Sequence, residues 1–413
     1  MASDTWILGG YQSDFARTLA KEGSGIGDLA REVVLATLEA AGVGPGAVES
    51  IHVGNAFGQL YCGQGHLGAM VATVVPELWG VPAMRHEAAC ASGSVATLAA
   101  AAEIEAGRYD CVLVVGVEQE KTMPTSEAAK VQAAAAWVGP DTEGVEFIWP
   151  ATFDLLADEY DRRFGLDDRH LRAIGELNLT NAKANPRAQT RSWKFAEGSF
   201  GADDRQNPAV AGRLRRNDCC QITDGGAGLV LVSDRWLARH RRAPAARLSG
   251  WGHSTVGLSL QPKLDRSAGD AYVMPHVRRA VTDARRRAGI GGGSPDCTID
   301  AVDVVETHDC MTPSEYMAID HLGITGPGQS WQAIEDGLIA RDGPIPVNPG
   351  GGLIGGGHPV GATGARMLVD AMRQVTGTAG DYQIDGAGRV QTLNIGGSTA
   401  TTVSFVVQQA PPA

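Results

Sequence analysis

One pattern of strand and helix occurs twice in the chain, and it limits the folds that the sequence can adopt. Residues 47–56 (AVESIHVGNA) are an apolar stretch of strand length after a Gly/Pro-rich turn, and residues 299–310 (IDAVDVVETHDC) have the same form. Each is followed further along by a helical stretch that opens with small residues, ASGSVATLAAAAEIEA and GATGARMLVDAMRQ. Such alternation is typical of α/β units around mostly parallel sheets. We therefore predict two duplicated α/β halves.

A polar stretch rich in glycine and proline separates the two halves. Residues 121–212 break the alternation and are too long for an ordinary connection inside a compact domain. We interpret this stretch as an inserted, partly helical loop domain. The predicted N-terminal half then comprises 1–120, completed by a strand within 213–243, and the C-terminal half comprises 244–413.

Charge and cysteine content narrow the classes of partner. The net charge of −12 argues against nucleic acid, because phosphate-backbone binding needs a basic face. Seven irregularly spaced cysteines do not form a disulfide framework, and the adjacent pair Cys219–Cys220 lacks the spacing of a zinc site. No apolar run of about 20 residues could cross a bilayer, and the N-terminus does not resemble a secretory signal. We expect a cytoplasmic protein that binds neither nucleic acid nor membranes.

A local basic cluster is a candidate for binding an anionic ligand. Arg235, Arg239 and Arg241 lie within the stretch DRWLARHRRAPAARL. Such a cluster is more often the solvated face of a helix. It is nevertheless the better of two arginine-rich stretches for contacting the phosphates of a coenzyme.

Cys90 stands at the predicted start of a helix, in the stretch HEAACASGSVAT. A thiol at a helix N-terminus faces the positive end of the helix dipole, so we expect its pKa to be lowered. The residues that follow are small and leave room for a bulky substrate. The alternative is a cysteine that only fills the core.

Residues 348–367 (NPGGGLIGGGHPVGATGARM) are rich in glycine and contain a formal G-x-G-x-x-G match. We reject a dinucleotide site, because Pro359 follows the glycines where a helix should already have started, and no Gly-Lys-Ser/Thr of a P-loop is present. The glycines instead allow the chain to pass close to a substrate, with His358 presented at the turn.

Two shorter motifs complete the set of candidates. THDC contributes His308 and Cys310 after a buried strand, and NIGG is a glycine turn that can point backbone N–H groups inward as an oxyanion hole. Each has an ordinary structural explanation when taken alone. Because the duplication brings corresponding strand ends to one edge, we expect Cys90, His308, Cys310 and His358 to lie together.

Together these motifs closely resemble the thiolase superfamily over almost the whole chain. ACASGS is similar to its nucleophile motif and GGHPVGATGAR to its Gly-His-Pro motif. Most thiolases carry a second cysteine where this chain has Asn394. The sterol-carrier-protein type instead combines that asparagine with a His-Asp-Cys motif, as this chain does, although Met311 stands where that subgroup often has phenylalanine.

The resemblance implies a five-layer α-β-α-β-α fold with a loop domain over the active site. It also implies coenzyme-A-dependent acyl transfer, either thiolytic cleavage of a 3-ketoacyl-CoA or the reverse Claisen condensation. Cys90 would be the nucleophile, His358 its base and Cys310 the acid/base for the α-carbon, with His308 and His358 holding the enolate oxygen. The backbone N–H groups of Cys90 and Gly396 would form the oxyanion hole. Coenzyme A would be a substrate, with no metal or further cofactor.

Two alternatives stay open. Ketosynthase-like condensing enzymes also use a Cys-His-His set, and a thiolase-fold chain can be a non-catalytic subunit that binds a partner, such as a small zinc/OB-fold protein.

The resemblance further implies a homo-oligomer, either a dimer or a tetramer, and a role in the degradation of fatty acids or sterols.

Overall fold

The structure is a computed structural model that describes residues 3–290 and 299–411. Within these residues, nine strands form one mixed sheet in the order β3-β2-β4-β7-β1-β8-β11-β10-β9. Their bounds are β1 (Thr5–Gln12), β2 (Ser50–Gly54), β3 (Ala83–His86), β4 (Cys111–Glu118), β7 (Gly225–Ser233), β8 (Ala246–Thr255), β9 (Val304–Thr307), β10 (Arg389–Gly396) and β11 (Thr401–Gln409). A separate small ribbon pairs β5 (Ala209–Ala211) with β6 (Leu214–Arg215).

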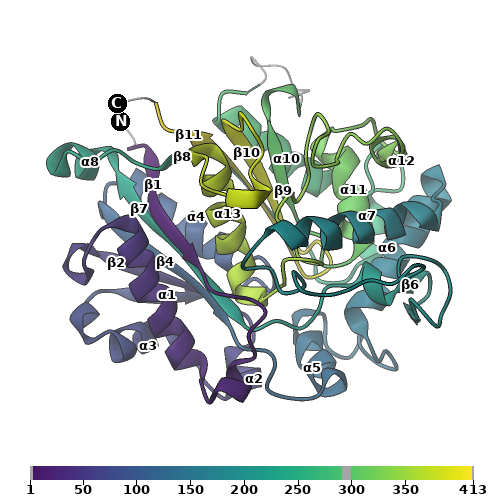
Figure 1. Cartoon of the computed structure of the whole chain (residues 1–413), viewed down its shortest axis with the longest axis horizontal. Coiled ribbons are helices and arrows are strands. Elements are labelled where there is room, and N and C mark those ends of the chain that lie inside the picture. Colours follow the sequence, from purple (N-terminus) through teal and green to yellow (C-terminus); the bar gives the residue numbers. More distant parts are fainter. Residues whose placement is uncertain (1–2, 291–298, 412–413) are drawn as a thin grey trace.

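Helices cover this sheet on both faces (Figure 1). The α-helices of the described residues are α1 (Ile26–Ala41), α2 (Gly58–Cys62), α3 (Leu67–Val74), α4 (Ser92–Glu105), α5 (Thr125–Gln132), α6 (Ile148–Phe164), α7 (Asp168–Asn181), α8 (Asp234–His240), α9 (Gln261–Arg266), α10 (Pro275–Arg287), α11 (Thr312–Leu322), α12 (Ser330–Glu335) and α13 (Thr363–Thr376). No helix in this part of the chain combines the length and hydrophobicity needed to span a bilayer.

The two strands predicted from the repeated pattern are β2 and β9, and both are fully buried. The strand expected within 213–243 is β7, which pairs between β1 and β4. The expectation of mostly parallel sheets is wrong, because only β2–β3, β2–β4 and β9–β10 are parallel among the pairs of the main sheet. One physical reason is the short turn after Gly396, since a connection of that length can join only antiparallel strands.

The elements stack in the predicted five layers. Helices α1 and α3 pack on the outer side of the N-terminal strands, and α10 and α11 pack outside the C-terminal strands. Helix α4 contacts strands of the N-terminal half, α13 contacts strands of both halves, and the two helices contact each other, so they form the central layer. The two β layers are continuous, because Thr5–Ile7 of β1 pair with Ala246–Leu248 of β8.

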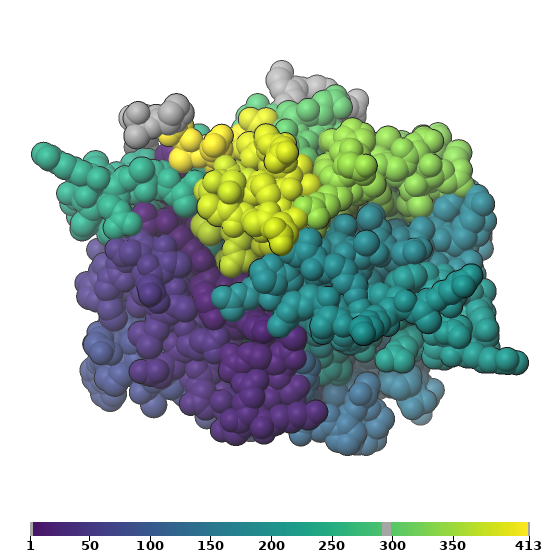
Figure 2. All heavy atoms as spheres, viewed as in Figure 1, coloured from purple at the N-terminus to yellow at the C-terminus, as the bar shows by residue number. Residues whose placement is uncertain are grey.

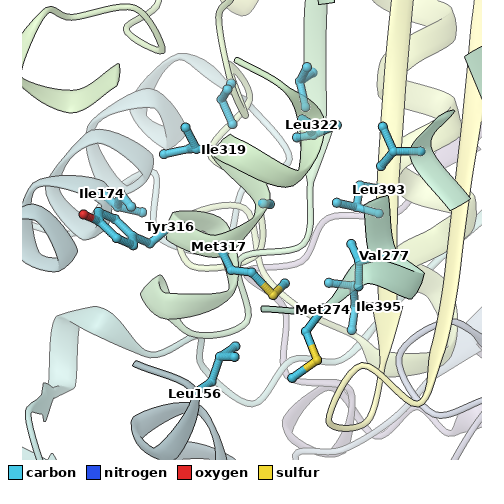
Figure 3. Close-up of a cluster of buried hydrophobic side chains, with 14 of the residues drawn as sticks. Leu156, Ile174, Met274, Val277, Tyr316, Met317, Ile319, Leu322, Leu393 and Ile395 are labelled. Carbon is cyan, nitrogen blue, oxygen red and sulfur yellow. The ribbon is translucent and has the colours of Figure 1, made fainter. Parts of the chain in front are cut away.

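The predicted loop domain shares its core with the C-terminal half. Figure 3 shows Leu156 of α6 and Ile174 of α7 beside Met317 of α11 and Leu393 of β10, and all four belong to one buried cluster. In the space-filling view, the teal residues of this region lie against both the purple N-terminal residues and the lime-green C-terminal residues (Figure 2). Helices α5, α6 and α7 give the region its helical content.

Close backbone contacts at the starts of α4 and α13 bring the two halves together. A Cβ at Gly54, where β2 ends, would lie 2.7 Å from the Gly93 Cα in α4 and 2.9 Å from the Gly361 carbonyl oxygen just before α13. Both neighbours are backbone atoms, which cannot move aside as a flexible side chain would. A residue without a Cβ is therefore required where β2, α4 and the start of α13 meet.

We predict that Gly54→Ala lowers the free energy of unfolding by about 1–3 kcal/mol, the usual cost of overpacking a well-packed core. Gly44→Ala is the matched control, because a Cβ at Gly44 would meet no atom within 4 Å. Urea unfolding of the two variants and the parent chain measures the difference. Equal midpoints for the two variants would contradict the packing argument.

Candidate active site

The structure brings the four predicted catalytic side chains together, with Cys90 after the carboxyl end of β3 and with His308 and Cys310 after the carboxyl end of β9. Cys90, Cys310 and His358 line one cavity of about 710 Å³. The His308 ring stands edge-to-face to the His358 ring, with 5.3 Å between the ring centroids. The Cys90 sulfur and one ring nitrogen of each histidine lie within 4.8 Å of one another.

Cys90 sits in a tight elbow just before α4. Ala89 has a φ of 50°, in the left-handed region that residues with a side chain rarely adopt. The Ser92 hydroxyl holds this elbow, since it accepts from the Ala88 N–H (2.9 Å) and donates to the Ala89 carbonyl (2.6 Å). Strained backbone held by its surroundings clusters at functional sites. Sequence reasoning treated Ser92 only as a small residue and missed this role.

The predicted lowering of the Cys90 pKa by the helix dipole is wrong. Burial raises the pKa of the thiol to about 12, although the backbone N–H groups of Gly397 and of Cys90 itself oppose the rise. Desolvation penalises the thiolate more than the helix start stabilises it. Cys90 therefore rests as a neutral thiol, and it would need a base to act as the predicted nucleophile.

His358 is held by the loop that leads into α13. Its backbone N–H donates to the Thr223 hydroxyl (2.9 Å), and its Nδ1 lies 2.7 Å from the Thr363 Oγ1. Burial, with a smaller contribution from the nearby Arg366 charge, lowers the pKa of His358 to about 3. Its Nε2 is buried and has no hydrogen-bond partner among the described residues. The ring is thus neutral, with a second nitrogen available for a ligand or a proton.

His308 and Cys310 lie in the loop after β9. Burial, together with the neighbouring His358, holds the pKa of His308 well below its ordinary value. Burial also raises the pKa of Cys310 well above its ordinary value, so Cys310 rests as a thiol. The Cys310 carbonyl accepts from the Cys220 N–H (2.9 Å), and both Cys219 and Cys220 line the cavity. The adjacent cysteines that match no zinc pattern therefore form part of its wall.

Asp309, between these two residues, joins the loop after β9 to the glycine-rich loop. Its carboxylate accepts from the N–H groups of Leu353 (2.6 Å) and Ile354 (3.0 Å) and from the Asn178 side chain (2.9 Å). Sequence reasoning gave Asp309 no role. An acid between two candidate catalytic residues was the available signal.

The glycine turn between β10 and β11 also reaches the cavity. Gly397 lines the cavity, and its N–H faces the Cys90 thiol. Gly396, the predicted oxyanion-hole donor, precedes it and packs so tightly that a Cβ would lie 2.2 Å from the Ala88 carbonyl oxygen. Lys263 holds the turn from behind through the Ser398 hydroxyl (2.7 Å) and the Ser398 carbonyl.

The predicted coenzyme-binding arginines lie elsewhere. Arg235 and Arg239 both donate to the Asp110 carboxylate, at 2.7 Å and 2.6 Å, and Arg241 ends α8. None of the three lines the cavity, and whether they contact a coenzyme stays a prediction. The basic residues that do line the cavity are Lys21, Lys121 and Arg216.

The cavity wall is largely apolar, and it includes side chains of the region between the halves. An apolar chain could be accommodated against the residues Phe57, Met123, Phe147, Ile148, Trp149, Phe153, Trp193, Val210 and Met311. The Cys90, His308 and His358 side chains are also close enough to bind a soft divalent cation between them. That no metal is required stays a prediction.

Comparisons with known proteins agree with this geometry. A family profile described as "Thiolase, N-terminal domain" matches residues 7–191, and one described as "Thiolase C-terminal domain-like" matches residues 264–409. The acetyl-CoA acetyltransferase of Methanothermobacter thermautotrophicus is 31% identical over 380 residues, covering 92% of this chain and 93% of the relative. Sterol carrier protein 2 of Gallus gallus is 26% identical over 399 residues, which cover 94% of this chain and 68% of the relative.

Solved structures confirm the predicted fold. The structure titled "Ltp2-ChsH2(DUF35) aldolase" superposes with a TM-score of 0.77 at 20% identity and covers 98% of both chains. Human mitochondrial 3-ketoacyl-CoA thiolase in complex with CoA superposes with a TM-score of 0.73 at 16% identity and covers 100% of both chains.

The neutral thiol and neutral imidazole predict how Cys90 responds to alkylation. His358→Ala should slow alkylation of Cys90 by iodoacetamide near pH 7, because the base that takes the thiol proton is lost. The difference in alkylation rate between His358→Ala and the parent chain should become smaller toward pH 11, because hydroxide then generates the Cys90 thiolate without His358. Peptide mass spectrometry follows Cys90 separately from the other cysteines. His240→Ala, at an exposed position in α8, is the control. Equal rates for His358→Ala and the parent chain at pH 7 would contradict the assignment.

Proposed function

The chain belongs to the thiolase family of coenzyme-A-dependent acyltransferases, and from this premise we propose that it cleaves 3-ketoacyl-CoA thiolytically or catalyses the reverse Claisen condensation. The observation that carries the proposal is the convergence of Cys90, His358 and Cys310 on one cavity, with His308 beside them. These side chains supply a nucleophile, a base, an acid and a hydrogen-bond donor, and this reaction needs all four.

In the direction of thiolysis, the first step acylates Cys90. Nε2 of His358, which has no hydrogen-bond partner among the described residues, takes the proton of the Cys90 thiol, and the sulfur attacks the 3-keto carbonyl. The oxyanion forms where the backbone N–H groups of Cys90 and Gly396 are predicted to donate, close to the Gly397 N–H that faces the sulfur. When the tetrahedral intermediate collapses, the bond between C2 and C3 breaks and the acyl group stays on Cys90. Acetyl-CoA leaves as its enolate.

The second cysteine completes the cleavage. Cys310 rests as a protonated thiol, so it can give its proton to C2 of the departing enolate without prior ionisation. In the condensation direction the same proton moves the other way, from C2 of the acetyl group to the Cys310 sulfur. Coenzyme A then attacks the acyl-Cys90 thioester, and its thiol proton returns to the enzyme. Both directions pass through the same buried Cys310 thiolate, so the degradative direction and a role in the breakdown of fatty acids or sterols rest on the resemblance to thiolases and are part of the proposal.

The cavity also suggests how the coenzyme is held. We propose that Lys21, Lys121 and Arg216 contact coenzyme phosphates, because they line the cavity. Arg235, Arg239 and Arg241 stay the alternative predicted from the sequence.

Two alternatives are separated by simple assays. A ketosynthase-like enzyme would prefer acyl-carrier-protein substrates over coenzyme A thioesters. A non-catalytic subunit would show no turnover alone, and the intact set of Cys90, His308, Cys310 and His358 argues against it.

A homo-oligomer and a small partner protein are both part of the proposal, and the DUF35 component named in one similar structure supports the partner. Free thiols at the described cysteines suit the cytoplasm.

We predict that Cys90 carries the acyl group. After incubation with a 3-ketoacyl-CoA, mass spectrometry should find the acyl mass on the Cys90 peptide, because Cys90 stands at the elbow before α4 with two backbone donors facing its sulfur. Cys90→Ala should take up no acyl group. An acyl group on Cys310 instead would reverse the two roles.

We predict that Cys310→Ala uncouples the two half-reactions. Proton transfer by a positioned side chain typically contributes about 10²–10⁴-fold, so turnover should fall by about that factor. Acylation of Cys90 by acetyl-CoA needs no proton at the α-carbon and should persist, whereas exchange of the acetyl methyl protons with deuterated water should fail. Cys219→Ala, another cysteine of the cavity wall, is the control and should keep this exchange. Normal exchange in Cys310→Ala would leave Cys310 as a space-filling residue.

A further inference from the structure

The Asn394 side chain connects two elements that meet only in the folded chain. The Ser94 hydroxyl in α4 donates to the Asn394 Oδ1 (2.8 Å), and the Asn394 Nδ2 lies 3.2 Å from Nδ1 of His308. All three side chains are buried. Asn394 lies in β10, so the contacts link β10 to the start of the central helix and to the loop after β9.

This chain of hydrogen bonds determines where His308 carries its proton. The amide oxygen can only accept and is used by Ser94, so the amide NH₂ group faces His308. Nδ1 of His308 must then be the acceptor and carry no proton. Burial keeps the ring neutral, and a neutral imidazole carries one proton, which is therefore on Nε2.

His358 has the opposite arrangement. The Thr363 hydroxyl donates its hydrogen to the Pro359 carbonyl (3.0 Å), so its oxygen is free to accept from Nδ1–H of His358 (2.7 Å). The proton of His358 is therefore on Nδ1, and its buried Nε2 presents a lone pair. The two rings, 5.3 Å apart, carry complementary tautomers.

We propose that Ser94 and Asn394 fix His308 in the Nε2–H tautomer, so that the site holds one histidine as a hydrogen-bond donor opposite one histidine as a base. The proposal rests on the proposed function, in which His308 donates to the enolate oxygen. Asn394 is a positioning residue, because it acts only through His308. With the other tautomer, His308 would present a lone pair to a negatively charged oxygen and destabilise it.

Nitrogen-15 NMR of histidine-labelled full-length protein tests the tautomer directly. His308→Gln identifies the His308 signals by their loss. In the parent chain, Nδ1 of His308 should give the signal of an unprotonated ring nitrogen and Nε2 that of a protonated one. The reverse assignment would overturn the proposal, since a flipped amide with Ser94 as acceptor would require Nδ1–H. This measurement needs no substrate, so its outcome is independent of whether the chain is a thiolase.

Two substitutions at Asn394 give a kinetic test. Asn394→Asp keeps the size of the side chain but can only accept, so it draws the His308 proton to Nδ1. Asn394→Ala leaves His308 free to adopt either tautomer. Exchange of acetyl protons with deuterated water should fall about 10²-fold in the aspartate variant, the lower end of the effect of losing one oxyanion donor, and less in the alanine variant.

Which of the two variants loses more proton exchange shows whether Asn394 positions His308 or only fills space. If Asn394 only fills space, the alanine variant, which leaves a cavity, should lose more activity than the aspartate variant. That order would overturn the proposal, as would unchanged His308 signals in Asn394→Asp. Acylation of Cys90 by acetyl-CoA should persist in both variants, which shows that each is folded. If the parent chain itself is not acylated at Cys90 by acetyl-CoA, the proposed function is rejected, whatever the NMR signals of His308 show.

Discussion

Backbone contact between the starts of α4 and α13 sets the separation of Cys90 and His358. A Cβ at Gly93 would lie 2.9 Å from the Ala365 N, and one at Gly364 would lie 2.3 Å from the Ser94 N. The two helices of the central layer therefore approach as closely as main chains allow. Cys90 precedes one helix and His358 precedes the other. Their side chains meet because no Cβ stands between the two helix starts, so the proposed nucleophile and its proposed base come from different halves of the chain.

Burial is the second constraint, and it decides the charge state of the site. Desolvation is the largest cause of the shifts that raise the pKa of Cys90 to about 12 and lower that of His358 to about 3. At neutral pH the Cys90 thiol and the His358 imidazole therefore rest uncharged, and in the proposed reaction charge appears on them only as it proceeds. Because buried groups are poorly solvated, such a site depends on donors that are already oriented toward the new charge. The Gly397 N–H faces the Cys90 sulfur in this way, and His308 is the second donor that we propose.

The sequence predicted which residues meet, and it failed where the answer depends on burial or on long-range contacts. The duplicated pattern correctly placed Cys90, His308, Cys310 and His358 together, because it located strand ends and helix starts. The direction of the Cys90 pKa shift was wrong, since a motif shows the helix dipole but not the surrounding protein. The contact between Ser94 and Asn394 joins residues 300 positions apart, which no local motif reveals.

Asp309 explains how the two histidines can serve different roles at a fixed distance. Its carboxylate binds two N–H groups of the glycine-rich loop that carries His358, while it belongs to the same loop as His308. The spacing of the rings therefore depends on main-chain contacts on the far side of the site rather than on the imidazole nitrogens that face the cavity. In the proposed reaction those nitrogens are then available to the thiol, the thioester oxygen and the enolate in turn. The proposed tautomers are held by the Thr363 hydroxyl and the Asn394 amide behind the two rings.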